Sequence, residues 1–280
     1  MANAARVAVV TGSNKGIGYA IVRALCKRFD GVVYLTARNP ELGEGSMAQL
    51  RAELGPEEGA KLRFHQLDIS DVASVGRFAA HLKKEHDRLD VLVNNAGIAF
   101  KNSATEPMEV QAAVTIATNY YATKEACKLL LPLLANNARV VNVCSQAGNL
   151  SMQGEPVRKR LTETGLTEAQ LDAIAEDFKS AAKDGTYKEK GFSQSTYCVS
   201  KALEIALSFL QQRQLMEERP QDQILVAPCC PGYVATDMSS YKGHLTIDQG
   251  AETPTMLCFL PYEKENLFKF WHDKQKHEWK

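Results

Sequence analysis

Tyr197 and Lys201 are the two residues of this chain whose types and spacing best suit proton transfer to a carbonyl oxygen. Four residues make about one helical turn, so the two side chains would lie side by side on one face of a helix. A phenol has a reference pKa of about 10, and a fixed ammonium beside it lowers that pKa toward the working range. The pair therefore predicts a general acid that protonates a ketone or aldehyde oxygen as hydride reaches the carbon.

The same spacing occurs a second time, at Tyr120 and Lys124. On spacing alone, either pair is better explained as neighbours on the surface of a helix than as a catalytic pair. The context of each pair must therefore separate them.

A glycine-rich turn near the start of the chain predicts a dinucleotide site. Gly12, Gly16 and Gly18 lie between an expected first strand and an expected helix, in a G-x-x-x-G-x-G spacing. Such a turn places backbone N–H groups and the positive end of a helix dipole at a pyrophosphate. The alternative is a purely structural turn, but its place at the first strand–helix junction favours a cofactor.

The residues after the second expected strand indicate whether the cofactor is NAD or NADP. NAD enzymes tend to carry an acidic residue there for the ribose 2′-hydroxyl, whereas this chain has Arg38 and, inside the glycine turn, Lys15. Guanidinium and phosphate pair through two hydrogen bonds, so two cations and no carboxylate favour a 2′-phosphate. We therefore predict NADPH.

Short apolar runs alternate with helical patterns, which is typical of a parallel sheet covered by helices. We expect an α/β fold of the Rossmann type, with a doubly wound parallel sheet of about seven strands in a single domain spanning residues 1–280. The expected strands are 6–11, 32–36, 62–67, 90–93, 139–144, 223–228 and 267–271, and the expected helices are 17–29, 71–86, 108–130 and 195–216.

The segment between Ser145 and Tyr197 breaks this alternation, and we expect a helical insert at about residues 149–193. Thr167–Gln170 matches a capping box, apolar residues follow at helical spacing over 171–178, and Gly185 is a stop signal. The apolar side of this helix should lie on the rest of the protein. The charged side, expected to face water, carries Glu168, Asp172, Glu176, Asp177, Lys179 and Lys183.

Charge and composition favour a small-molecule partner. The chain has 33 basic and 33 acidic residues, so its formal charge of zero gives no support to binding of nucleic acid or of an anionic membrane. No apolar stretch approaches the ~20 residues of a membrane helix, and the N-terminus has no signal-peptide pattern. Seven cysteines without metal-site spacing fit a reducing compartment, so we expect a cytoplasmic protein without a metal site.

Taken together, these motifs resemble the short-chain dehydrogenase/reductase family over roughly residues 5–260. The family's catalytic Tyr follows its Ser in the chain, so the resemblance selects Tyr197 and marks Tyr120 as a chance match. The matching segments are Thr11–Gly18 (the glycine turn), Asn94–Gly97 (Asn-Asn-Ala-Gly), Ser145, Tyr197 with Lys201, and Pro231–Thr236 (Pro-Gly-x-x-x-Thr).

The resemblance implies catalytic roles for Asn119, Ser145, Tyr197 and Lys201. Tyr197 would be the general acid, with Lys201 as its pKa partner and a ligand of the cofactor ribose. Ser145 would hydrogen-bond the substrate carbonyl as an oxyanion-hole donor does, and Asn119 would hold a water of the proton relay.

The resemblance also places the cofactor on the chain. Asp68 and Ile69 would meet the adenine, Asn95 the adenosine ribose, and Val234 and Thr236 the nicotinamide carboxamide and phosphates. The full set of expected cofactor-binding residues is Gly12, Asn14, Lys15, Gly16, Ile17, Gly18, Arg38, Asp68, Ile69, Asn95, Ala96, Gly97, Tyr197, Lys201, Pro231, Gly232, Val234 and Thr236.

Three strings, at 64–69, 94–101 and 229–232, look like the monomeric NADPH-dependent carbonyl reductases of animals. That group reduces quinones, aldehydes and ketones, and some members reduce prostaglandins or steroids. The chain departs from it at Cys144, where we expect Ser, and at Tyr233, where we expect Trp. The expected substrate contacts are Ser145, Cys230 and Tyr233, with an inert buried thiol as the equal alternative for Cys230.

Two other functions stay open. Plant monomeric reductases of terpenoid or alkaloid ketones share the insert and the chemistry. A catalytically silent NADP(H)-binding sensor would keep only the fold, although it would have no use for a complete set of Asn119, Ser145, Tyr197 and Lys201.

The insert also bears on the oligomeric state. In oligomeric relatives, the helices around 108–130 and 195–216 pair across a subunit interface. An insert that covers these helices predicts a monomer, whereas an insert that lies over the substrate as a lid would leave them free to pair.

Overall fold

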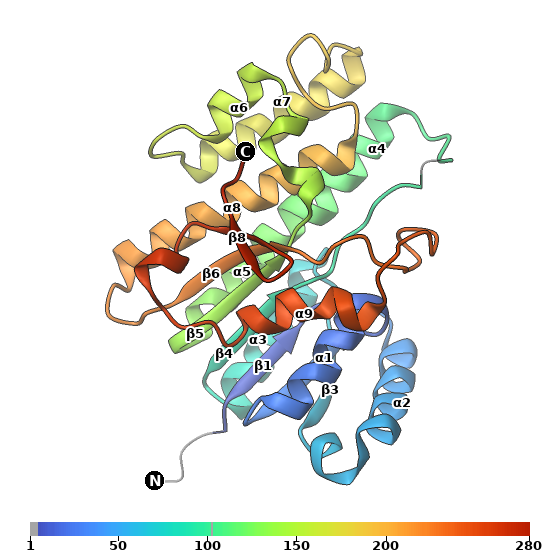
Figure 1. Cartoon of the computed structure of the whole chain (residues 1–280), viewed down its shortest axis with the longest axis vertical. Helices are drawn as coiled ribbons and strands as arrows, with labels where there is room; N and C mark the ends of the chain where they lie inside the picture. The colour runs from blue at the N-terminus through green and yellow to red at the C-terminus, as the bar shows by residue number, and fades with distance from the viewer. Residues whose placement is uncertain (1–4, 102) are drawn as a thin grey trace.

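The computed structural model describes residues 5–101 and 103–280 and is built around one eight-stranded sheet (Figure 1). The strand order is β3-β2-β1-β4-β5-β6-β7-β8; strands β1 to β7 run parallel, and β8 pairs antiparallel with β7. The order reverses between β1 and β4, where the loops at the carboxyl ends of the strands form a ligand crevice in such sheets. The strands are β1 Val7–Val10, β2 Val32–Ala37, β3 Leu62–Gln66, β4 Leu89–Asn94, β5 Leu134–Val143, β6 Leu225–Cys230, β7 Phe270–His272 and β8 Gln275–His277.

Helices cover both faces of the sheet (Figure 1). Helices α1, α2 and α9 pack on one face, and α3, α5 and α8 pack on the other. The helices are α1 Gly16–Arg28, α2 Pro40–Gly59, α3 Val72–Glu85, α4 Met108–Thr115, α5 Thr123–Leu130, α6 Glu155–Leu161, α7 Glu168–Asp184, α8 Thr196–Glu218 and α9 Ile247–Leu257.

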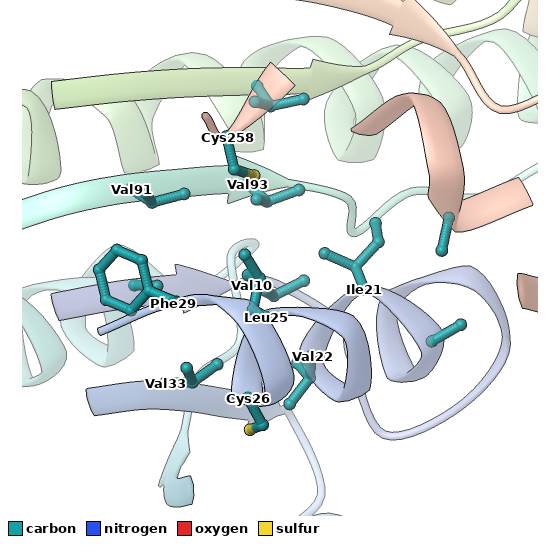
Figure 2. Packing of buried hydrophobic residues seen from close by; sticks show 14 of the residues in the cluster. Val10, Ile21, Val22, Leu25, Cys26, Phe29, Val33, Val91, Val93 and Cys258 are labelled. Carbon is teal, nitrogen blue, oxygen red and sulfur yellow. The ribbon is translucent and has the colours of Figure 1, made fainter. Parts of the chain in front are cut away.

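Strand β1 shows how the two cores are made. Ala8 and Val10 belong to the core beneath α1, whereas Val7 and Val9 belong to the core beneath α3, because successive strand residues point to opposite faces. Figure 2 shows the packing of α1 around Leu25, which is fully buried. Burial on both faces fixes β1 and α1 firmly and so holds the turn between them.

The predicted doubly wound α/β fold is confirmed, but several of its elements differ from those expected. Strand β7 begins a few residues later than expected, and the exposed three-residue strand β8 was not expected because it has no apolar pattern. Helix α9 was missed, and so was helix α2. Its pattern is interrupted at Gly55, which has a φ of 78° and precedes Pro56.

The helix expected over 108–130 is continuous but not regular. Between α4 and α5 lies a π-helical segment, Ile116–Ala122, which contains Asn119. Such segments are rare and often mark functional sites. The widened turn thus falls at the residue that the sequence selected on this helix.

The insert consists of two helices, α6 and α7, of which only α7 was expected. A capping box between Thr167 and Gln170 begins α7, and Gly185 ends it with a φ of 75°, as predicted. Leu171 and Phe178 of α7 are buried in one cluster with residues of α4 and α8. Figure 1 shows α6 and α7 as a further layer outside those two helices.

The charged side of α7 does not face only water, which corrects our expectation. Asp172 accepts hydrogen bonds from Tyr120 Oη and Lys124 Nζ, both at 2.7 Å, and Glu168 lies 3.2 Å from Lys124 Nζ. Tyr120 is fully buried and Lys124 is 4% exposed, so they are not the surface pair that the bare spacing suggested. Their contacts with Asp172 and Glu168 dock α7 onto the π-helical segment and α5.

Candidate active site

The turn after β1 requires glycine at three positions. Gly12 and Gly16 have φ values of 59° and 60°, in the left-handed region that other residues rarely adopt. A Cβ on Gly12 would lie 2.9 Å from Ala96 Cα, and one on Gly18 would lie 2.5 Å from Asn95 Nδ2. The turn is therefore packed directly against the loop that follows β4.

Hydrogen bonds fix the turn from two sides. Asn95 Nδ2 donates to the carbonyls of Thr11 and Gly12, at 2.9 and 3.0 Å. Ser13 N–H donates to Thr36 O at 2.8 Å, and Thr36 N–H donates to Ser13 Oγ at 2.9 Å. Ser13 and Thr36 were not selected from the sequence, because a bond between two strand ends leaves no local pattern. Asn95 N–H also donates to Thr11 Oγ1 at 3.0 Å, so only Oδ1 and the backbone carbonyl of Asn95 are left for a ribose.

The start of α1 faces the same turn and suits a pyrophosphate. Lys15 is at the N-cap position and makes no side-chain bond to the first helical turn, so the N–H groups of that turn remain available. A Cβ on Gly16 would lie 3.5 Å from Thr236 Cγ2, so the loop after β6 lies against the turn. Asn14 and Ile17 flank this point. Free N–H groups and the helix dipole attract an anion, and the residues present therefore fit a dinucleotide.

Two cations were selected from the sequence for this region, Lys15 in the turn and Arg38 after β2. Arg38 follows β2 directly and is exposed. Lys15 Nζ lies 2.5 Å from Asp237 Oδ2, in a largely exposed ion pair. Asp68 and Ile69 follow the neighbouring strand β3; the Asp68 carboxylate accepts from the backbone of Ser70 at 2.9 Å, and Ile69 is buried.

Tyr197, Lys201 and Ser145 come together at the carboxyl ends of β5 and β6. Lys201 Nζ lies 5.7 Å from the centre of the Tyr197 ring, one helical turn away on α8. Ser145 Oγ accepts from Ala147 N–H at 3.1 Å, so its own hydrogen can serve as a donor, to Tyr197 or to a substrate oxygen. The arrangement offers a phenol, a hydroxyl donor and a cation around one point.

Opposing influences set the pKa of Tyr197. Burial raises this pKa, the Lys201 ammonium lowers it, Glu204 raises it, and a hydrogen bond with Ser145 lowers it; the net direction is upward. The lowering by Lys201 was predicted. The net upward direction was not, because the sequence argument included neither burial nor Glu204.

Lys201 is held by two oxygens. Its Nζ donates to Val143 O at 3.1 Å and lies 2.6 Å from Glu204 Oε2, and both side chains of this ion pair are 5% exposed. Burial lowers the pKa of Lys201, but Glu204 raises it and the net direction is upward, so the ammonium stays charged. Sequence reasoning missed Glu204, because a Lys and a Glu three residues apart on a helix are usually an exposed pair.

Asn119 links the loop after β4 to α8. Its Oδ1 accepts from Ile98 N–H at 2.8 Å, and its Nδ2 donates to Ile98 O at 2.9 Å and to Ser200 Oγ at 3.0 Å. A Cβ on Gly97 would lie 3.2 Å from Asn119 Oδ1 and 3.6 Å from Lys201 Nζ. Gly97 therefore lets Asn119 and Lys201 approach the same loop, with one lone pair of Oδ1 left for a water.

The loop from Pro231 to Thr236 continues from β6 past this cluster. Gly232 has a φ of 83°, and a Cβ there would lie 2.5 Å from Leu245 Cδ1. Val234 is buried and bridges to Leu245. The loop is thus packed against Leu245 at Gly232 and Val234, and against the glycine turn at Thr236.

The two other expected substrate contacts differ in exposure. Tyr233 is 50% exposed, with its ring 6.1 Å from that of His244. Cys230 is 4% exposed, and its Sγ accepts from Gly232 N–H at 3.3 Å. Burial raises the pKa of the Cys230 thiol, which is therefore protonated at neutral pH, as an inert thiol would be.

Comparison with known proteins identifies the family. The family model described as "short chain dehydrogenase" matches residues 6–157. The chain belongs to the short-chain dehydrogenase family. Carbonyl reductase (NADPH) 3 of Rattus norvegicus is 43% identical over 263 residues, which cover 93% of each chain. Carbonyl reductase (NADPH) 1 of Homo sapiens is 41% identical over 282 residues, covering 100% of each chain. The solved structure of salutaridine reductase from Papaver somniferum has a TM-score of 0.83 and 27% identity, and the match covers 96% of this chain and 99% of that one.

In residues 5–101 and 103–280, no group of three or more His, Cys, Asp or Glu side chains is arranged to hold a metal ion. Over the same residues, no helix combines the length and apolarity needed to cross a bilayer.

Proposed function

We propose that this short-chain dehydrogenase is a carbonyl reductase that uses NADPH to reduce quinones, aldehydes and ketones to alcohols, with prostaglandins and steroids as further candidate substrates. The observation that carries the proposal is the convergence of Tyr197, Ser145 and Lys201 at the strand ends. Identities of 41–43% with the NADPH carbonyl reductases named above, over almost the whole chain, support the same activity.

The chain's own residues move and hold the proton, and bound NADPH supplies the hydride. Tyr197 gives its phenolic proton to the carbonyl oxygen as negative charge develops there. Ser145 donates its hydroxyl hydrogen to the same oxygen and stabilises that charge. Lys201 stabilises the phenolate that remains, and Asn119 holds a water through which the proton is replaced.

The cofactor would lie across the ends of β1, β4 and β6. Gly12, Gly16 and Gly18 leave room for the pyrophosphate, whose charge the start of α1 attracts. Lys15 and Arg38 would bind the 2′-phosphate. The remaining contacts would come from Asn14, Ile17, Asp68, Ile69, Asn95, Ala96, Gly97, Tyr197, Lys201, Pro231, Gly232, Val234 and Thr236.

We place Ser145 and Tyr233 at the substrate. Tyr233 is half exposed at the edge of the cluster and offers an aromatic surface to an apolar carbonyl compound. Cys230, buried beneath Ser145, would contact the substrate only through its small apolar surface.

The protein would act as a cytoplasmic monomer on small molecules, without nucleic acid or membrane partners. All seven cysteines are buried and free, which fits a reducing compartment. Helix α7 packs on α4 and α8, the helices through which oligomeric relatives pair, and this supports a monomer.

Oxidation of NADPH, followed by absorbance, tests the activity with menadione and an aromatic aldehyde. We expect turnover of both compounds, with NADPH strongly preferred over NADH. A folded protein that binds NADPH but oxidises none of it with either compound would contradict the proposal and would indicate a binding protein.

A further inference from the structure

A buried carboxylate lies beside Lys201, although it has no role in the proposed proton transfer. Glu204 is 4% exposed, and its Oε2 lies 2.6 Å from Lys201 Nζ. No hydrogen bond from any other described residue reaches this oxygen. A buried charge costs free energy that an apolar residue at the same place would avoid. The position therefore calls for a reason beyond packing.

We propose that Glu204 is a positioning residue of the reaction: it holds the Lys201 ammonium in place and keeps Tyr197 in its proton-donating form at alkaline pH. This inference rests on the proposed roles of Tyr197 and Lys201. It adds to them a residue that determines over which pH range the enzyme works as a reductase.

Two oxygens close to Nζ hold the Lys201 ammonium in place, and one of them belongs to Glu204. An ammonium has three N–H donors; here one goes to Val143 O at 3.1 Å, and Glu204 Oε2 lies 2.6 Å from Nζ as its counter-ion. These two contacts anchor Nζ at the end of β5. The remaining donors are left for Tyr197 and for a cofactor ribose.

The charge part follows from the groups around Glu204. On α8 these are Lys201 and Tyr197, and at the end of β5 there is Cys144; Cys230, at the end of β6, lies near Tyr197 and Cys144. Burial raises the pKa of both thiols, so they carry no charge near neutral pH. Lys201 and Glu204 therefore determine the charge beside Tyr197.

Protonation of Glu204 changes that charge within the physiological range. Burial raises the pKa of Glu204 to about 7, although the Lys201 ammonium lowers it. Below this pH the carboxyl is neutral, and Lys201 lowers the pKa of Tyr197 unopposed. Above it the carboxylate opposes Lys201 and raises the pKa of Tyr197, so the phenol stays protonated to higher pH.

The variant Glu204→Gln tests this proposal, because it keeps the shape of the side chain and removes the charge. Rates of carbonyl reduction and of the reverse alcohol oxidation are measured from weakly acidic to strongly alkaline pH. We expect the alkaline limb of reduction to move down by about one pH unit. The acid limb of oxidation, which requires the phenolate, should move down in the same direction. Below pH 7, reduction by the variant should stay within about threefold of the wild-type rate.

Two further variants separate charge from structure. Glu204→Asp keeps the charge and shortens the reach, so both limbs should stay near their wild-type positions while kcat falls. Asp172→Asn is the matched control, because Tyr120, Lys124 and Asp172 form another buried cluster of Tyr, Lys and carboxylate. It should lower stability and leave both limbs in place. If Glu204→Gln does not fold, Glu204→Met should give the same shift.

The inference would be overturned by a folded Glu204→Gln or Glu204→Met variant whose two pH limbs, of reduction and of oxidation, stay at their wild-type positions. This holds even if its kcat were lower at every pH. Failure of the proposed function would look different: wild-type protein would oxidise no NADPH, or Tyr197→Phe would keep full activity. The two failures are thus distinguished by the wild-type and Tyr197→Phe rates.

Discussion

The chain contains two Tyr–Lys pairs of identical spacing, and their surroundings give them different chemistry. Tyr120 donates its hydroxyl to Asp172 at 2.7 Å, and burial together with that carboxylate raises the pKa of Tyr120 above its ordinary value. The phenolic proton of Tyr120 is held in this hydrogen bond to Asp172 and is not available for transfer to a substrate. Tyr197 instead has Ser145 and Lys201 beside it and is partly exposed, so a substrate oxygen can approach it.

The first prediction follows from this difference. Tyr197→Phe should lower kcat for menadione by about 10²–10⁴-fold, because one positioned acid is worth that much. The dissociation constant for NADPH, measured by fluorescence titration, should change by less than about threefold, since the ring still packs. Tyr120→Phe is the matched control and should keep kcat. Equal losses of kcat from the two substitutions would mean that the catalytic pair is wrongly assigned.

The second prediction concerns Arg38 and the preference for NADPH over NADH. Arg38→Asp should lower kcat/KM with NADPH by about 10–100-fold, because a charge-assisted contact with the 2′-phosphate becomes a repulsion. The same carboxylate can accept from a 2′-hydroxyl, so kcat/KM with NADH should rise. Steady-state kinetics with both cofactors measure the change.

The control for this prediction is Lys27→Asp, which makes the same charge change in the last turn of α1, at the end away from the glycine turn. It should leave the cofactor preference unchanged. Wild-type protein that uses NADH as well as NADPH would contradict the assignment of Arg38.

At the scale of elements, local signals were sufficient for some parts of the structure and not for others. The glycine turn and the cap of α7 could be predicted because each is specified by residues within one short stretch. The bond between Ser13 and Thr36, and the docking of Asp172 onto Tyr120, depend on segments that meet only in the folded chain. The same holds for Glu204, whose burial is a property of the packing of α8 and not of its sequence.

The docking of α7 gives a prediction of stability. Tyr120→Phe should lower the free energy of unfolding by about 1–2 kcal/mol, because it removes a buried hydrogen bond to a carboxylate. Tyr121→Phe removes a similar bond, at 2.7 Å to Glu176, but this carboxylate is 56% exposed and the loss should be under about 0.5 kcal/mol. Urea unfolding of both variants makes the comparison. A larger loss for Tyr121→Phe would contradict the proposed docking contact.

At the scale of the whole molecule, α7 determines which surface remains for association. Leu171 and Phe178 are fully buried against the cluster that includes α4 and α8, so the chain covers this face itself. Two valines of α4, Val110 and Val114, remain 42% and 41% exposed. Two side chains fall far short of the roughly 1,200 Å² that a stable interface buries.

We therefore expect a monomer of 30.9 kDa in sedimentation equilibrium at micromolar concentration. Phe178→Asp should loosen α7 by placing a charge in its buried face, and it should raise the apparent mass through exposure of the apolar surface beneath. Asp172→Asn weakens the docking without adding a charge to the buried face and should stay monomeric. A wild-type dimer or tetramer would show that a different surface mediates association and that α7 does not decide the oligomeric state.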